Sequence, residues 1–146
     1  MAGYTPPTGF HFSVNFGEVS TMQNDTLFQS VSGLNIEMET ENYKEGGENR
    51  FDHVLPVRTR YSNLVLNRGM LVDSKVIEWC LKTFETLTIK PANIVISLLN
   101  EKHEPLVTWN IVNAWPVKWS VNGMNAEESR LFIETLELRY QYFTKV

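Results

Sequence analysis

Alternation of apolar and polar residues along most of the chain constrains its fold more than any other feature. From Phe10 to Phe16 every even position is apolar and every odd position is polar, which is the period of a half-buried strand. Comparable strand patterns follow at 27–41, 53–61, 94–99, 106–114, 117–121 and 131–143. Six or seven strands in a chain of 146 residues favour an antiparallel β-barrel or sandwich.

A single segment, in the middle of the chain, carries a convincing helical pattern. Its apolar residues recur at i, i+3, i+4 and i+7, at Ile77, Cys80, Leu81 and Phe84. This spacing predicts an α-helix from about Ser74 to Phe84 that packs on the sheet, with Asp73 or Ser74 accepting hydrogen bonds from the first amides. Trp79 lies off the stripe, so we expect it either to widen the buried face or to contact something outside the subunit.

Net charge and hydropathy argue against several classes of partner. The chain has 13 basic and 17 acidic residues and a net charge of −4, so no electrostatic attraction to nucleic acid or anionic membranes is expected. No stretch approaches the ~18 apolar residues of a membrane span, and the start lacks a signal-peptide pattern. We expect a protein that folds in the cytosol as one domain over residues 1–146, with residues 1–9 as an extended arm.

Residues that could carry chemistry do not form a recognisable site. Glu37, Glu39 and Glu41 alternate along one predicted strand, where like charges repel and normally mark a solvated surface. The single cysteine, Cys80, lies on the predicted buried face of the helix, which favours packing over reactivity. The three histidines lack the spacing of metal ligands. The sequence therefore predicts no catalytic residue, no cofactor, no metal site and no enzymatic activity.

The segment around Gly46 and Gly47 predicts the tip of a long hairpin. Polar residues interrupt the alternation there, and Pro56 indicates a strand edge, a bulge or a break. Charged side chains gather on one parity of the flanking strands and of the last strand, at Glu37, Glu39, Arg58, Arg60, Glu137 and Arg139. They fit either the solvent side of a monomeric sheet or a long hairpin that reaches a neighbouring subunit.

Three motifs in series resemble the tail tube proteins of contractile phages and contractile injection systems. They are Tyr61–Gly69 following Leu55 and Pro56, Trp109–Lys118, and Asn125–Glu128 leading into Ile133–Leu138. The order and spacing extend the resemblance over nearly the whole chain, from Phe10 to Tyr142. The sequence thus resembles an inner tube subunit.

This resemblance implies a β-barrel with one flanking helix, six copies of which form a ring, and rings that stack into a rigid hollow tube. The charged parity would line the lumen, and the apolar parity would face the core and the helix. The hairpin tip would contact the next ring through Glu45, Gly46, Gly47, Glu48, Asn49 and Arg50. Its glycines permit the close backbone approach that stacking needs.

The resemblance also implies partners and a location. Sheath, baseplate and tube-terminating proteins are the implied partners, and cargo protein or nucleic acid would pass through the lumen without specific binding. The tube would be assembled in the cytoplasm, would not insert into a membrane by itself, and would become part of a virion tail or of an extracellular or membrane-anchored injection particle. A phage tail and an injection system both fit, as do a principal tube subunit and a first ring at the baseplate.

An alternative from another class is a monomeric β-barrel that binds a small apolar ligand in its interior. The helix face would plug such a barrel, and the charged parity of three strands does not suit an apolar pocket. An enzyme is the third alternative, although no motif supports it.

Overall fold

The computed structural model describes residues 11–21, 23–43, 53–69, 73–122 and 132–146. The expected N-terminal arm at 1–9 lies outside these residues. In chain order the elements are β1 (His11–Asn15), η2 (Gln23–Thr26), β2 (Leu27–Phe28), β3 (Ser30–Ser32), β4 (Ile36–Tyr43), β5 (His53–Tyr61), β6 (Leu64–Gly69), α1 (Lys75–Thr86), β7 (Ala92–Leu99), β8 (Pro105–Asn122), β9 (Ile133–Arg139) and β10 (Tyr142–Lys145).

The larger sheet closes on itself and forms a barrel. Its strands follow the order β2-β1-β7-β8-β9-β6-β3, and every pair is antiparallel. Because only Gln29 separates β2 from β3, this one segment pairs with β1 at one end and with β6 at the other. The Gln29 amide also donates to the Asn67 carbonyl of β6 at 2.8 Å. The predicted antiparallel barrel is confirmed, and its closure pairs the strands that would otherwise be edges.

A single bent strand, β8, spans the barrel. The sequence predicted two strands here, but β8 is continuous over 18 residues. Its first part pairs with β7 and β10, and its second part pairs with β9. Asn113 has a positive φ of 55°, and the register shifts between Pro116 and Lys118. The strand therefore changes direction at a bulge without ending, and the bulge accommodates a proline that has no amide to donate.

Alternation along the strands fills the barrel with apolar side chains. In β6 and β9 successive residues alternate between buried and partly exposed positions, as the two-residue period of a strand requires. The side chains with at most 1% exposure include Val14, Phe16, Leu64, Leu66, Ile94, Ile96, Ile111, Leu136 and Leu138. This confirms the inward parity predicted for the first strand and for Leu136 and Leu138 of the last one. The predicted last strand is divided into β9 and β10, and Tyr142 of β10 is exposed.

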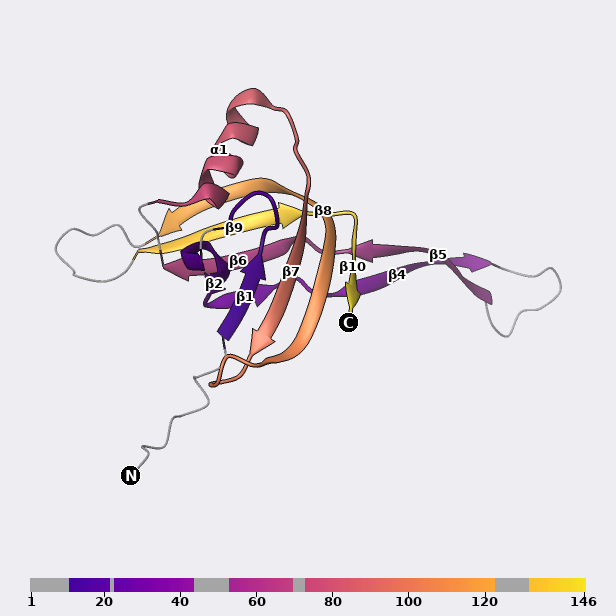
Figure 1. Cartoon of the computed structure of the whole chain (residues 1–146). Helices are drawn as coiled ribbons and strands as arrows, with labels where there is room; N and C mark the ends of the chain where they lie inside the picture. Colours follow the sequence, from indigo (N-terminus) through magenta and orange to yellow (C-terminus); the bar gives the residue numbers. More distant parts are fainter. Residues whose placement is uncertain (1–10, 22, 44–52, 70–72, 123–131) are drawn as a thin grey trace.

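α1 lies against one side of the barrel (Figure 1), close to its predicted span. Ser74 is the N-cap, and its hydroxyl accepts a hydrogen bond from the Ile77 amide at 3.2 Å. At the other end, Leu87 adopts a left-handed conformation and its amide donates to the Thr83 carbonyl. Both ends of the helix are therefore capped locally.

The buried face of α1 differs from the predicted one. The residues that face the core are Val76, Cys80 and Thr83, whereas Leu81 and Phe84 are exposed. The reason is the anchoring of the first turn, where the buried N-cap Ser74 fixes how the helix is rotated about its axis. Trp79 packs against the core cluster, so it widens the buried face, which was one of the two expected outcomes.

β4 and β5 form a separate two-stranded sheet that projects away from the barrel (Figure 1). Each strand continues a barrel strand, because β3 leads into β4 and β5 leads into β6 after very short connections. At this root Gly33 has a φ of 92°, and a Cβ there would lie 1.9 Å from the Asn63 carbonyl oxygen. Glycine is required for the two backbones to approach this closely.

A β-bulge changes the parity of β5. Glu39 pairs with Arg58 but the next residue, Thr40, pairs with Pro56, so Val57 is the extra residue. This confirms one of the irregularities expected at Pro56. The two-residue period predicted for the strand at 53–61 would place Leu55 on the face opposite Arg58 and Arg60. That prediction is wrong, because the bulge places Leu55 opposite Glu41 on the charged side.

Candidate assembly surfaces

The projecting hairpin exposes apolar side chains along one face. Met38 is 59% exposed, and Ile36 and Val54 are exposed to a similar degree. Met38 pairs with Thr59 and Ile36 pairs with Tyr61, so these residues share a face. The expectation that this apolar parity packs on the subunit's own core and helix is wrong, because the hairpin extends beyond the barrel. We call this surface the hairpin apolar face.

Aromatic side chains hold the root of this face against the barrel. The Tyr61 ring packs edge-to-face on Tyr140 and on Phe143, with centroid distances of 5.8 and 5.3 Å. Burial, with a smaller contribution from Tyr61, raises the pKa of Tyr140 to about 12. The root of the hairpin is therefore fixed while the rest of its apolar face stays open.

The opposite face of the hairpin brings together four of the six charged residues predicted for the lumen. Arg58 Nε lies 2.9 Å from Glu39 Oε2, and Arg60 Nη1 lies 3.8 Å from the other carboxylate oxygen. Glu37 pairs with Arg60 across the strands. These side chains are well exposed, so each ion pair contributes roughly 0–1 kcal/mol. The face is hydrated and carries both signs of charge.

The other predicted site residues lie elsewhere. Glu137 and Arg139 belong to β9 in the barrel wall, where Glu137 pairs with Val65 on one side and Lys118 on the other. No interaction between these two residues and the charged side chains of the hairpin occurs in the described part of the chain. The tip residues Glu45, Gly46, Gly47, Glu48, Asn49 and Arg50 lie outside the described residues.

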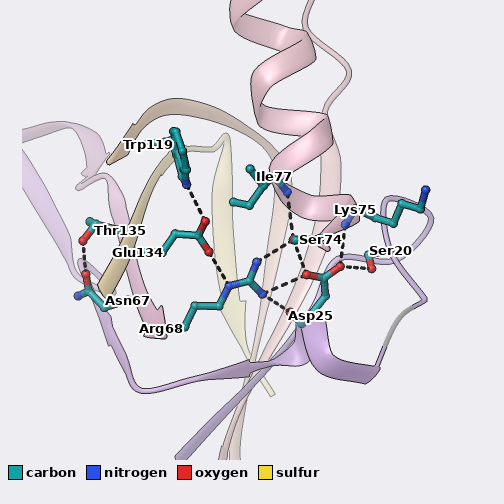
Figure 2. A network of polar contacts seen from close by, with 10 residues as sticks. All are labelled: Ser20, Asp25, Asn67, Arg68, Ser74, Lys75, Ile77, Trp119, Glu134 and Thr135. Atoms are coloured by element: carbon teal, nitrogen blue, oxygen red, sulfur yellow. Dashed lines mark hydrogen bonds and ion pairs between the residues drawn. The ribbon is translucent and has the colours of Figure 1, made fainter. Parts of the chain in front are cut away.

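The structure contains a buried polar network that the sequence analysis did not predict. The Arg68 guanidinium lies between two carboxylates, with Nη1 3.1 Å from Asp25 Oδ1 and Nε 3.0 Å from Glu134 Oε2 (Figure 2). Its Nη2 donates to Ser74 Oγ at 2.8 Å, and the Trp119 indole donates to Glu134 Oε1 at 2.9 Å. The three charged side chains are at most 3% exposed. The network ties η2, β6, β8, β9 and the start of α1 together.

Asp25 is the centre of this network on the helix side. Its carboxylate accepts hydrogen bonds from the Ser20 and Ser74 hydroxyls and from the Lys75 amide (Figure 2). Burial alone raises the pKa of Asp25, but these three hydrogen bonds and the Arg68 charge together hold it below its ordinary value. Asp25 therefore supplies a fixed negative charge at the positive end of α1.

This lowered pKa predicts how stability depends on pH. Because the folded state binds the Asp25 proton less tightly than the unfolded state, its contribution is present above the unfolded pKa of about 4 and is lost as pH falls through the folded pKa. We expect Asp25→Asn to cost about 1–3 kcal/mol at pH 7, with a smaller difference from the unaltered chain at acid pH. Urea unfolding between pH 7 and pH 2 measures this; a difference that grows on acidification would contradict it.

One signal for the network was present in the sequence. Arg68 shares the parity of Leu64 and Leu66, and Glu134 shares the parity of Leu136. Two opposite charges on the inward parity of two strands predict a buried pair if those strands are neighbours. The sequence did not reveal that β6 and β9 pair, which places Arg68 directly across from Glu134.

A second apolar surface surrounds the end of α1. Leu87 is 86% exposed, and a shallow groove of about 280 Å³ runs beside it. The groove is lined by Thr83, Phe84, Leu87, Ile89, Trp115, Pro116 and Val117. The helix ends and β8 bends here, so the exposed side chains come from the αL cap and from the bulge. A contiguous apolar patch of this kind is a candidate subunit interface.

Among the residues that the structure describes, the remaining titratable groups form no catalytic arrangement. Cys80 is fully buried, and burial raises the pKa of its thiol to about 12, so the thiolate form is scarce at neutral pH. The described residues contain no group of three or more potential metal ligands. The part of the chain described by the structure also lacks a helix of the length and apolarity that a membrane span requires.

Comparisons with known proteins agree with this architecture. Residues 8–144 match the family model described as T4-like virus tail tube protein gp19. A chain in the six-fold symmetrised cryo-EM structure of the anti-feeding prophage (AFP) baseplate is 30% identical, with a TM-score of 0.78 and coverage of 100% of this chain and 97% of that chain. No curated protein sequence matches significantly.

More distant structures share the fold. A chain in the extended PVC sheath-tube complex is 24% identical with a TM-score of 0.74, and the match covers 100% of this chain and 93% of that chain. Hcp1 from Flavobacterium johnsoniae is 13% identical with a TM-score of 0.55, over 92% and 94% of the two chains. Since the family model spans almost the entire sequence, the predicted family is confirmed, and this chain belongs to the T4-like tail tube proteins, a family of structural tube subunits.

Proposed function

We propose that six copies of this chain form a ring and that the rings stack into a rigid hollow tube of a phage tail or of a contractile injection particle. The observation that carries the proposal is the β4–β5 hairpin, which projects from a closed barrel and whose two outer strand edges pair with no other strand among the described residues. Long unpaired edges promote uncontrolled association unless an assembly uses them. Side-by-side pairing of hairpins around a ring satisfies these edges through closure.

The two faces of the hairpin suit two different surroundings. The hairpin apolar face would lie against the neighbouring subunit, because exposed apolar area of this kind drives association. The opposite face, with Glu37, Glu39, Arg58 and Arg60, would line the lumen, and Glu137 and Arg139 would extend that lining along the barrel wall. A hydrated surface that carries both signs of charge lets protein or nucleic-acid cargo pass without specific binding.

Other contacts follow from the same arrangement. The tip loop, residues 45–50, would reach the next ring, where its two glycines permit close backbone packing. Solved neighbours include a baseplate, a sheath-tube complex and a tube-terminating cap, which supports partners of these three kinds here. The role is mechanical and involves no catalysis. Assembly would take place in the cytoplasm, before sheath contraction drives the tube through a target envelope.

The ring proposal predicts that a charged residue on the hairpin apolar face prevents ring formation but leaves the stability of the folded subunit nearly unchanged. We expect Met38→Asp to change the free energy of unfolding by no more than about 0.5 kcal/mol, because the side chain is exposed in the subunit. The same change should abolish rings, because assembly would bury the new carboxylate without a partner. Urea unfolding and negative-stain electron microscopy at high protein concentration measure the two effects.

A matched control distinguishes this surface from a general effect of added charge. Leu106 is also an exposed apolar residue, but it lies at the start of β8 outside the hairpin. Leu106→Asp should therefore leave ring formation unchanged. Rings of normal appearance from Met38→Asp would overturn the role assigned to the hairpin apolar face.

The ligand-binding alternative gains no support from the barrel. Its interior is occupied by the buried side chains of β1, β6, β7, β8 and β9. The grooves found around α1 lie on the outer surface. A small apolar ligand would have to displace core side chains at a cost of several kcal/mol.

A further inference from the structure

A groove runs along the side of α1 that faces β1 and β7. Four residues of the helix line it at positions i, i+3, i+4 and i+7, namely Lys75, Glu78, Trp79 and Lys82. The opposite wall consists of the turn after β1, residues 16–19, and the segment 90–93 that begins β7. The groove has a volume of about 640 Å³, and an adjoining one of about 180 Å³ shares Trp79, Lys82 and Lys90 with it. We call it the tryptophan groove.

The floor of the tryptophan groove is held in place by several contacts. The Trp79 indole N–H donates to the Lys90 carbonyl at 2.9 Å, which joins the two walls. The Trp79 ring also packs edge-to-face on the buried Phe16, with a centroid distance of 6.2 Å. The turn that forms the far wall is closed by the Asn15 side chain, which accepts from the Gly17 amide at 2.8 Å. A fixed floor lowers the ordering cost of binding.

The groove is lined by more lysines than glutamates, although the chain as a whole has a negative net charge. Lys82 and Lys90 are exposed and lie on opposite walls of the groove, Lys82 on α1 and Lys90 on the segment before β7. Within the described residues, neither of these two ammonium groups forms an ion pair. Lys75 does, because its Nζ lies 3.3 Å from Glu78 Oε2. In a chain of net charge −4, three lysines thus outnumber the two glutamates, Glu18 and Glu78, that line this groove.

We infer that the tryptophan groove binds an acidic segment of a partner protein. The segment would place one carboxylate at Lys82 and one at Lys90, with an apolar side chain between them on Trp79. Aromatic anchors surrounded by polar groups are the usual centres of protein interfaces. The inference concerns the outer surface of a single subunit, so it goes beyond the proposed tube and does not depend on ring formation.

The charges that line the groove favour a peptide over nucleic acid as its ligand. Two free lysines neutralise far fewer phosphates than the roughly 6–10 contacts of a typical nucleic-acid binder. Glu18 and Glu78 also line the groove and would repel a phosphate backbone. A protein segment can alternate carboxylates with apolar residues and avoid those two positions.

The test uses the full chain labelled with nitrogen-15 and a synthetic amphipathic peptide of glutamate and leucine. The Trp79 indole signal, assigned with Trp79→Phe, should move on titration with this peptide. It should stay in place with the matched lysine–leucine peptide and with a short oligothymidine. Lys82→Glu combined with Lys90→Glu should weaken binding about tenfold, which corresponds to about 1.4 kcal/mol.

A matched charge control is Lys102→Glu combined with Lys145→Glu, which alters the net charge equally but lies in the β7–β8 turn and in β10. Binding by this control should stay within about twofold of the unaltered chain. Equal weakening by both double variants, a stationary Trp79 signal, or preference for the oligonucleotide would overturn the inference. Ring formation by each variant is scored separately, so failure of the groove and failure of the tube are distinguishable.

Discussion

Replacing Arg68 with leucine is expected to destabilise the folded chain by about 3–5 kcal/mol. The guanidinium is 3% exposed and bridges Asp25 and Glu134, which are themselves buried. Leucine would fill much of the space but would leave two carboxylates inside the protein without a counter-charge. It would also remove the donor that reaches the N-cap hydroxyl of Ser74. Urea unfolding at pH 7 measures the loss.

Two controls make this expectation specific. Arg58→Leu also breaks an arginine–carboxylate pair, but the two side chains are 72% and 38% exposed, so the cost should not exceed about 1 kcal/mol. If Arg68→Leu does not fold, the double variant with Glu134→Leu becomes informative. Removing one of the uncompensated charges should restore part of the stability, and a double variant no more stable than Arg68→Leu would contradict the assigned role.

Replacing Gly33 with alanine is the second change with a large expected effect. The added Cβ would lie 1.9 Å from the Asn63 carbonyl oxygen and 3.3 Å from Leu64 Cα, and neither backbone atom can move without displacing the root of β6. The φ of 92° adds conformational strain for any residue with a side chain. Together these effects should cost about 2–6 kcal/mol in the free energy of unfolding.

Gly17→Ala separates the two contributions. Gly17 also has a positive φ, of 62°, but a Cβ there would meet only the Asn93 carbonyl oxygen at 3.4 Å. Its cost should therefore be the conformational one alone, about 1–2 kcal/mol. Thermal or urea unfolding of both variants measures the difference. If both substitutions lowered the free energy of unfolding equally, the backbone at the root of the hairpin would be able to move away from the added Cβ, contrary to this prediction.

The fold was predictable wherever one face of a strand is buried and the other is exposed to solvent. Val14, Leu136 and Leu138 follow the two-residue period, and the structure buries all three. The helix span and its Ser74 cap were predictable for the same kind of local reason. The rotation of α1 was not predictable, because the apolar pattern favoured Leu81 and Phe84, whereas the core instead takes Val76 and the polar Thr83. Tertiary anchoring at the helix start decided between the alternatives.

The candidate surfaces were predictable only in part. Alternation correctly grouped Glu37, Glu39, Arg58 and Arg60 on one face of the hairpin. It failed for the part of β5 that precedes Val57, because one bulged residue reverses the side on which the residues before it lie relative to those after it. The network around Arg68 needed the pairing of β6 with β9, which is a contact between residues far apart in sequence. Periodicity describes a single strand and contains no information about its neighbour.

The continuity of the hairpin with the barrel wall has a mechanical consequence. Because β3 runs into β4 and β5 runs into β6, a pull on the hairpin is directed along the axes of the barrel strands. Since β3 and β6 are pulled together, the load passes to the antiparallel hydrogen bonds of β6 with β9, which would be loaded in shear, where many bonds share the force at once. Peeling, in which the bonds break one after another, would require a force across the strands.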